Sequence, residues 1–310
     1  MKIMVTGGGG FIGSYLLPVL LSHGHQVAVF DFAVEPLLSH EIMTRIDYLR
    51  GDLGSMSDLY GALMAFRPEG VIHLGAILAG ACEANPIRCY RTNFGSTQVL
   101  LEASLSLKVQ KFFMMSSIAV FGRDAVEPVS DSAPKNPETI YGQTKLASEH
   151  LMLWYVRNRG LDACAIRPTL VFGPGRTTGL TARYTSQVLD SIASGKPMVV
   201  PNPDQRGDWL YVKDAVKAIA AAWETPLSDQ RIFNITGSIH SVREVVGIAK
   251  RLRPEAQVAF EETDAGPSPY AVAYDDSAAK KTLRYFPDYT IEAAVAEHLK
   301  TVSEQRNTRK

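Results

Sequence analysis

Short runs of β-branched and other apolar residues alternate with longer segments of helical periodicity through the first half of the chain. The runs are apolar at successive positions, which is typical of strands covered on both faces. Helices between such strands make right-handed crossovers in a parallel sheet. The predicted strands are Lys2–Thr6, Gln26–Asp31, Asp47–Leu49, Val71–Leu74, Lys111–Ser116 and Ala163–Arg167, and the predicted helices are Phe11–His23, Met56–Phe66, Ile87–Leu107 and Tyr141–Asn158. The pattern therefore predicts the α/β class with a doubly wound parallel sheet.

After Pro168, glycines and prolines divide the chain into shorter pieces. Helical periodicity returns in three segments, which are Val212–Trp223, Val242–Leu252 and Ile291–Val302. We expect residues 1–170, with parts of about 205–235, to form the sheet domain, and residues 171–310 to form mainly a smaller mixed α/β lobe for substrate. Open α/β sheets bind ligands at the carboxyl edge of their strands, so the lobe is expected to cover that edge.

Composition narrows the class of protein. The 310 residues carry 32 Lys and Arg against 32 Asp and Glu, so the chain has no excess of basic residues. A surface that binds nucleic acid would need such an excess. No apolar run approaches the roughly 18 residues of a membrane span, and Met1-Lys2 leads directly into a strand instead of a signal peptide. Cys82, Cys89 and Cys164 form no Cys-x-x-Cys pair and are odd in number, which argues against a disulfide framework and against zinc. We expect a soluble cytoplasmic protein in a reducing compartment, without a metal, a membrane partner or a nucleic-acid partner.

A glycine-rich turn joins the first predicted strand to the first predicted helix. Gly7, Gly10 and Gly13 have the spacing Gly-x-x-Gly-x-x-Gly. A pyrophosphate requires this order of strand, tight turn and helix N-terminus, because the free N–H groups of the helix bind phosphate oxygens. Asp31 ends the second predicted strand, where a carboxylate accepts hydrogen bonds from an adenosine ribose and repels a 2′-phosphate. We therefore expect NAD as the cofactor in preference to NADP, against the simpler reading of a flexible turn.

A tyrosine and a lysine share one face of the fourth predicted helix. Tyr141 and Lys145 are four residues apart, which places the ammonium beside the phenol. The pKa of a free phenol is about 10, and the positive charges of the lysine and of a nicotinamide favour the phenolate. Ser117 lies at the carboxyl end of the fifth predicted strand, where its hydroxyl can bind the substrate oxygen that Tyr141 protonates or deprotonates. Taken singly, the pair is also explained as a surface contact and the serine as a cap.

In combination these residues resemble the extended short-chain dehydrogenases/reductases, the NAD-dependent epimerase/dehydratase family, over nearly the whole chain. The resemblance implies an enzyme with a Rossmann fold, with Ser117, Tyr141 and Lys145 as catalytic residues, and a homodimer formed through the helices at 87–107 and 141–158. The cofactor contacts that it implies are Gly7, Gly10, Phe11, Ile12, Gly13, Asp31, Asp52, Leu53, Leu74, Gly75, Ala76, Asn93, Tyr141, Lys145 and Pro168, and the substrate contacts are Ser117, Ile118, Tyr141, Thr177 and Thr178.

The second half departs from the pattern of the sugar-nucleotide epimerases in this family. Leu170 stands where they usually carry Asn, Gly207 where they usually carry Arg, and the acidic segment 261–267 where a further Arg is typical. A diphosphate needs charge-assisted donors, and Arg176 and Arg183 are the residues that could replace those missing.

Two segments, 73–86 and 116–122, resemble threonine dehydrogenases of the short-chain type, and erythronate dehydrogenases are similar around Ser117. We therefore expect an oxidoreductase that transfers hydride between NAD and a small polar alcohol of the hydroxy acid or amino acid type. One alternative is a nucleotide-sugar 4-epimerase or dehydratase with tightly bound NAD, which forms no net NADH. The other is a catalytically idle NAD-binding or scaffold protein.

Overall fold

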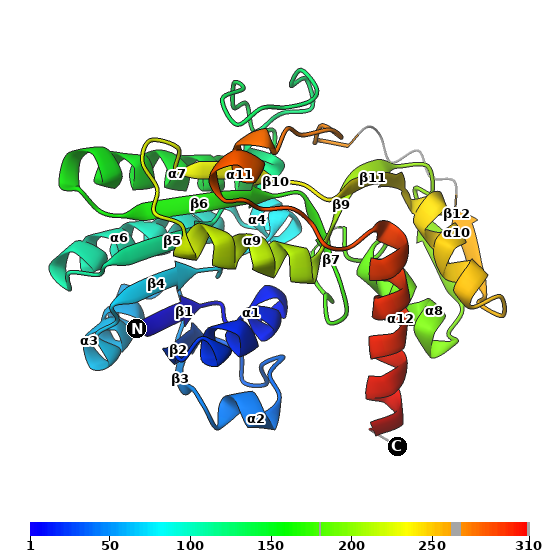
Figure 1. Cartoon of the computed structure of the whole chain (residues 1–310), viewed down its shortest axis with the longest axis horizontal. Coiled ribbons are helices and arrows are strands. Elements are labelled where there is room, and N and C mark those ends of the chain that lie inside the picture. The colour runs from blue at the N-terminus through cyan, green and yellow to red at the C-terminus, as the bar shows by residue number, and fades with distance from the viewer. Residues whose placement is uncertain (180, 262–267, 309–310) are drawn as a thin grey trace.

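Seven parallel strands form the central sheet of the computed structural model, which describes residues 1–179, 181–261 and 268–308. The strands are β1 (Lys2–Thr6), β2 (Gln26–Asp31), β3 (Asp47–Arg50), β4 (Gly70–His73), β5 (Lys111–Met115), β6 (Ala163–Pro168) and β10 (Ile232–Ile235). Their order across the sheet is β10-β6-β5-β4-β1-β2-β3 (Figure 1). The order reverses between β1 and β4, which is the switch point of a doubly wound sheet. The predicted fold class is confirmed.

Helices cover both faces of the sheet, as strands with two apolar faces require. The helices on one face are α1 (Phe11–Ser22) and α9 (Val212–Glu224), and those on the other are α3 (Met56–Phe66), α6 (Ser96–Ser106) and α7 (Ile140–Arg159). Consecutive residues of β5 enter the two different cores: Phe113 packs with α1 and α9, and Phe112 packs with the other three helices. Side chains alternate across a strand, so the two rings point to opposite faces of the sheet. Both are fully buried because helices cover each face.

The helix predicted over 87–107 is divided in the structure. It consists of α5 (Pro86–Cys89), a π-helical turn at Tyr90–Gly95, and α6. The turn carries Asn93, whose side chain hydrogen-bonds the backbone of Ile77 in the loop after β4. Such turns are frequent at functional sites. The prediction of one continuous helix was wrong because periodicity does not register a contact with a distant loop.

Cys82 and Cys89 form a disulfide, which corrects the inference drawn from cysteine number and spacing. The first cysteine lies in the short helix α4 (Ala79–Ala84) and the second in α5. The break between the two helices leaves the Cα atoms of Cys82 and Cys89 4.9 Å apart, within the range that a disulfide bridges. Cys164 is free and buried. The prediction against a disulfide was wrong, because cysteine number and spacing do not show that the chain turns between Cys82 and Cys89.

The second half of the chain builds a smaller lobe at one end of the sheet (Figure 1). It contains a three-stranded sheet of order β11-β9-β7 and a two-stranded sheet of β12 and β8. Its strands are β7 (Leu170–Phe172), β8 (Met198–Pro201), β9 (Arg206–Tyr211), β11 (Ser238–Ser241) and β12 (Val258–Glu261), and its helices are α8 (Ser186–Ser194), α10 (Val242–Leu252) and α12 (Ile291–Thr308). The remaining short helices are α2 (His40–Met43) and α11 (Ser277–Thr282). Within the described ranges, no helix is both long and apolar enough to cross a bilayer.

Candidate active site

The glycine turn after β1 meets the loop after β4 at the switch point. Gly7 has a φ of +70°, and a Cβ on this residue would lie 2.5 Å from the Cα of Gly75. A Cβ on Gly13 would lie 2.2 Å from the carbonyl oxygen of Gly8. Glycine at position 7 lets the two loops touch, and glycine at position 13 lets α1 start directly against the turn. Leu53 closes the group, since its Cδ1 would lie 2.4 Å from a Cβ on Gly75.

The N-terminus of α1 opens onto this turn. Gly10 is the N-cap and provides no side-chain hydrogen bond, and the first turn of the helix contains no acidic residue. The backbone N–H groups of Phe11 and Ile12 are therefore available to an anion, and the helix dipole favours negative charge at this end of the helix.

The Asp31 carboxylate lies beside the same turn. Its Oδ2 accepts a hydrogen bond from the Gly9 N–H at 2.9 Å, and its Oδ1 accepts one from the Ala33 N–H at 3.1 Å. Asp31 is only 7% exposed, so these bonds fix its direction. Each carboxylate oxygen retains a lone pair for a ribose hydroxyl. The glycine turn, the helix N-terminus and Asp31 together fit the pyrophosphate and adenosine ribose of NAD.

Asp31→Asn is expected to weaken NAD binding by about tenfold or more, because it replaces charge-assisted hydrogen bonds to the ribose with neutral ones. The affinity for NADP is expected to fall less, since the repulsion of a 2′-phosphate is lost as well. Calorimetric titration with both dinucleotides measures this, with Asp47→Asn at the exposed start of β3 as the control. Equal losses for NAD and NADP would contradict a ribose-binding role for Asp31.

Ser117, Tyr141 and Lys145 converge where β5 ends and α7 begins. The Nζ of Lys145 donates a hydrogen bond to the carbonyl of Met115 at 2.7 Å and lies 5.8 Å from the centre of the Tyr141 ring. The Oγ of Ser117 accepts the N–H of Ala119 at 3.1 Å, so the serine does cap a turn, and its hydroxyl lies close enough to Tyr141 to act against the rise of the phenol pKa. The three predicted catalytic residues therefore form one cluster.

Burial determines the protonation of the tyrosine and the lysine. Burial raises the pKa of Tyr141 to about 12, against the opposing effects of the Ser117 hydroxyl and the Arg176 charge. Burial also lowers the pKa of Lys145 to about 8, and Glu149 opposes that shift. The chain by itself thus holds Tyr141 as a neutral phenol that can donate a proton. The predicted lowering of its pKa requires added positive charge at the site.

The other predicted cofactor residues follow the same edge of the sheet. Leu74 continues β4, and its N–H donates to the carbonyl of Thr6 at 3.0 Å. Asp52 is exposed, and its Oδ1 accepts the N–H of Gly54 at 2.8 Å. Pro168 is the last residue of β6. The residues that the structure brings to this edge are Gly7, Gly10, Phe11, Ile12, Gly13, Asp31, Asp52, Leu53, Leu74, Gly75, Ala76 and Pro168. Their individual contacts with NAD stay predictions.

Asn93 is engaged within the chain. Its amide oxygen accepts the N–H of Ile77 at 2.8 Å, and its amide nitrogen donates to the Ile77 carbonyl at 3.0 Å and to Thr144 Oγ1 at 3.2 Å. Asn93 thereby fastens the loop after β4 to α7. Its predicted contact with the cofactor stays a prediction.

The predicted substrate threonines are less enclosed than a neighbouring arginine. Thr177 and Thr178 are exposed, whereas Ile118 is partly buried next to Ser117. The guanidinium of Arg176 donates to Thr181 Oγ1 at 2.6 Å and to the carbonyl of Val171, and its charge acts on Tyr141. Arg176 is therefore a charged group of this loop that is near enough to act electrostatically on Tyr141.

Glu149 is a residue that the sequence reasoning missed. It lies four residues after Lys145, so Tyr141, Lys145 and Glu149 share one face of α7. Its side chain is 1% exposed and bonds Arg167 and Ser116. The extended spacing Tyr-x-x-x-Lys-x-x-x-Glu was the signal that could have found it.

Residues 3–236 match the NAD dependent epimerase/dehydratase family. The chain belongs to this family. A UDP-glucose 4-epimerase of Corynebacterium glutamicum is 27% identical over 306 residues, which cover 94% of this chain and 92% of that protein. A D-erythronate dehydrogenase of Haemophilus influenzae is 27% identical over 266 residues, which cover 83% of this chain and 84% of that protein. The holo form of a GalE-like L-threonine dehydrogenase from Cupriavidus necator has a TM-score of 0.87 at 24% identity and covers 97% of this chain and 100% of its own.

Membership in the epimerase/dehydratase family confirms that the protein is an NAD-dependent enzyme of the extended short-chain dehydrogenase/reductase type. It confirms NAD as the cofactor. The relatives include both epimerases and dehydrogenases, so the family alone does not choose between the two reactions.

Proposed function

We propose that the protein is an NAD-dependent dehydrogenase of a small hydroxy acid or amino acid. The main support is that Leu170 on β7 lies beside Gly207 on β9: a Cβ added to Gly207 would lie 3.4 Å from the Cδ2 of Leu170. These are the positions at which sugar-nucleotide epimerases of the family usually carry Asn and Arg. Here the neighbouring residues are leucine and glycine, and neither has a side-chain donor for a diphosphate.

The candidate replacement arginines also favour a smaller anion. Arg183 is exposed and donates to the carbonyl of Val199 at 3.5 Å. Arg206 directly precedes Gly207, so strand alternation turns it to the opposite face of β9. Arg176 is left as the guanidinium whose charge acts on Tyr141, and a single guanidinium matches a single carboxylate. Residues 262–267 of the acidic segment lie outside the described part of the chain.

The geometry of the cluster supports a role for Tyr141 in proton transfer. The hydroxyls of Ser117 and Tyr141 would hold the alcohol oxygen of the substrate between them, and Arg176 would hold its carboxylate. Bound NAD supplies the nicotinamide that takes up or returns the hydride. In the reducing direction the neutral Tyr141 phenol donates its proton to the substrate oxygen. In the oxidising direction Tyr141 takes the proton once the ammonium of Lys145 and the cofactor charge favour its phenolate.

The second candidate is a nucleotide-sugar epimerase, favoured by the similarity to a UDP-glucose 4-epimerase over 94% of this chain. The same serine, tyrosine and lysine would serve that reaction. The two candidates differ in the fate of the hydride, which an epimerase returns to the substrate. They therefore differ in whether net NADH accumulates.

A substrate panel separates these candidates. We expect net NADH with at least one hydroxy acid or amino acid, and no isomerised product from UDP-, GDP- or TDP-sugars. Arg176→Gln is expected to raise the KM of the active acid by about tenfold or more, because a charge-assisted hydrogen bond is lost. Arg183→Gln serves as the matched control and should leave KM unchanged. Isomerisation of a nucleotide sugar without net NADH would contradict the proposal.

We also propose a homodimer formed through residues 87–107, which span α5, the π-helical turn and α6, and through α7. Apolar side chains are exposed on these elements: Ile87 is 85%, Tyr90 39% and Trp154 48% exposed. An interface formed by these elements would cover these exposed apolar side chains. Light scattering is expected to give the mass of a dimer for the wild-type protein and for Phe286→Glu, an exposed apolar site elsewhere, and that of a monomer for Trp154→Glu. A monomeric wild-type protein would contradict the dimer. The cytoplasmic location stays a prediction.

A further inference from the structure

A buried ion pair joins α7, the helix that carries Tyr141 and Lys145, to the neighbouring strand β6. Arg167 on β6 and Glu149 on α7 form two parallel hydrogen bonds, Nε to Oε1 and Nη2 to Oε2, each 2.7 Å long. Their side chains are 4% and 1% exposed. Desolvation of two charges offsets most of their attraction, so a buried pair adds little stability over apolar residues of the same size. Stability alone does not account for this pair.

The Glu149 carboxylate joins the elements that carry the catalytic residues. On α7 it lies one helical turn beyond Lys145. Its Oε1 accepts a second hydrogen bond from the hydroxyl of Ser116, the residue directly before Ser117 at the end of β5. Through Arg167 it is also tied to the end of β6. One carboxylate thus connects α7, β5 and β6 at the place where the site is assembled.

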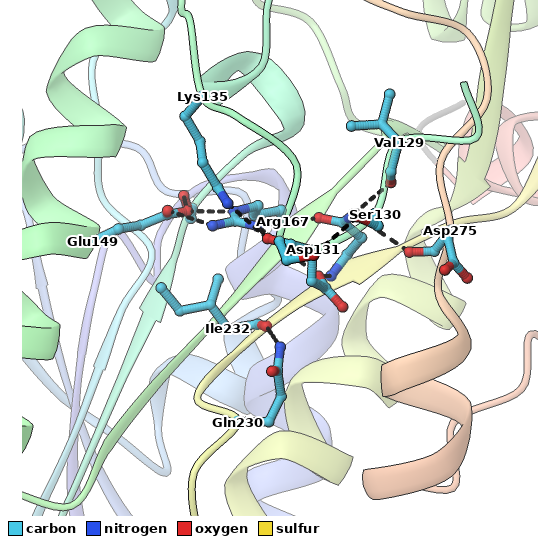
Figure 2. Close-up of polar contacts among 12 residues, drawn as sticks. Val129, Ser130, Asp131, Lys135, Glu149, Arg167, Gln230, Ile232 and Asp275 are labelled. Carbon is cyan, nitrogen blue, oxygen red and sulfur yellow. Dashed lines mark hydrogen bonds and ion pairs between the residues drawn. The ribbon is translucent and has the colours of Figure 1, made fainter. Parts of the chain in front are cut away.

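Arg167 is itself fixed from its other side, as Figure 2 shows. Its Nη1 donates to the main-chain carbonyl of Asp131 at 3.1 Å and lies 3.9 Å from the Asp131 carboxylate. The guanidinium lies over the ring of Phe121, with 5.0 Å between its carbon and the ring centre. Asp131 in turn accepts the backbone N–H of Asn234 in β10 at 2.6 Å. These contacts leave the guanidinium one orientation in which to meet Glu149.

We propose that Glu149 is the positioning residue of this active site: its carboxylate, held by Arg167 and Ser116, keeps Lys145 charged and fixes the strand end that carries Ser117 relative to Tyr141. The inference rests on the proposed function for the reaction that these residues serve. It goes beyond that function by assigning a role to a residue that touches neither the substrate nor the cofactor.

The charged and titratable groups around Lys145 support this role. Tyr141 and Glu149 face it from α7 and His73 from β4, and burial together with the Lys145 charge lowers the pKa of His73 to about 3, so His73 is neutral. The other charged groups next to Glu149 are Arg167, Lys135 and Asp131 (Figure 2). Removing the charge of Glu149 therefore withdraws the negative group that supports the ammonium, and Lys145 should lose its proton at lower pH.

Titration of Lys145 by nuclear magnetic resonance tests the proposal without any substrate. In protein isotopically labelled at the lysine ε carbon, the signal that disappears in Lys145→Met identifies Lys145. We expect the titration midpoint of Lys145 at about pH 8 in the wild-type protein. In Glu149→Gln it should lie about one pH unit lower. Glu149→Asp keeps the charge and should return the midpoint toward the wild-type value. Glu138→Gln, which breaks the surface pair with Arg123, is the matched control and should change nothing.

A second variant keeps the test decisive if Glu149→Gln folds poorly, since that change leaves the buried charge of Arg167 unpaired. The double variant Glu149→Met/Arg167→Met removes both charges with little change of volume and is expected to fold. Its Lys145 midpoint should also lie below the wild-type value. An unchanged midpoint in every folded Glu149 variant would overturn the proposal and show that the pair is only structural.

Turnover gives an independent reading of the same proposal. Folded Glu149→Gln is expected to lose about tenfold or more in kcat with KM nearly unchanged, because it disturbs proton transfer and not substrate binding. If the wild-type protein forms no NADH from any acid, the proposed function fails while the Lys145 titration still decides the role of Glu149. The two failures are therefore distinguishable.

Discussion

Tyr141→Phe is expected to lower kcat about a thousandfold and to leave the affinity for NAD within about twofold of the wild-type value. The change removes one hydroxyl and keeps the ring that packs at the start of α7. Ser117 can still bind the substrate oxygen, but the phenol that exchanges the proton beside the Lys145 ammonium is gone. Steady-state turnover and an NAD titration on the same preparation measure both quantities.

Tyr155→Phe is the matched control for this change. Tyr155 lies on the same helix, where its hydroxyl donates to Glu102 at 2.6 Å, outside the catalytic cluster. We expect its kcat to stay near that of the wild-type protein. Retained turnover in Tyr141→Phe would assign proton transfer to another group. A parallel loss of NAD affinity would make Tyr141 a cofactor residue first, and lost turnover with NAD still bound would exclude an idle binding protein.

Gly7→Ala is expected to weaken NAD binding by about a hundredfold and to destabilise the fold by about 2–4 kcal/mol. An alanine would have to adopt the positive φ of +70°, and its Cβ would lie 2.5 Å from the Cα of Gly75. The backbone on both sides of this contact cannot yield as a flexible side chain would, so the glycine turn and the loop after β4 must separate. Urea unfolding and NAD titration report the two effects.

Gly160→Ala isolates the part of the effect that comes from the close contact. Gly160 has nearly the same φ, +66°, and a Cβ there would meet nothing within 4 Å. Its substitution should cost only the conformational strain, about 1 kcal/mol, and leave NAD affinity unchanged. Similar results for the two variants would show that the meeting of the two loops does not shape the cofactor site.

The sequence predicted the sheet more closely than the lobe. The six predicted strands agree with the structure to within a residue at either end, because runs such as Lys111–Ser116 are apolar on both faces and lie between helices. In the lobe, strands such as Ser238–Ser241 and Val258–Glu261 are only partly buried and mix polar with apolar residues, so they lack the continuous apolar runs of the central sheet. The divided helix at 87–107 and the Cys82–Cys89 disulfide depend on how α4 and α5 meet, and periodicity does not encode that.

The predicted site residues lie together because their motifs are local. Gly7 and Gly13 need only a strand followed by a helix, and Tyr141 and Lys145 need only one helical turn. The groups that sequence reasoning missed or left undecided depend on distant segments. Glu149 acquires its role from Arg167, which is 18 residues away in the sequence and on another element.

The most direct test of the proposed function is the accumulation of NADH when the wild-type protein is mixed with NAD and hydroxy acids or amino acids in the absence of any nucleotide sugar. Leu170 and Gly207 lie beside each other without a donor for a diphosphate, and the charge of Arg176 acts on Tyr141. The proposed function therefore predicts net NADH in proportion to the acid consumed. Isomerisation of a UDP-, GDP- or TDP-sugar, with no NADH formed from any acid, would contradict it.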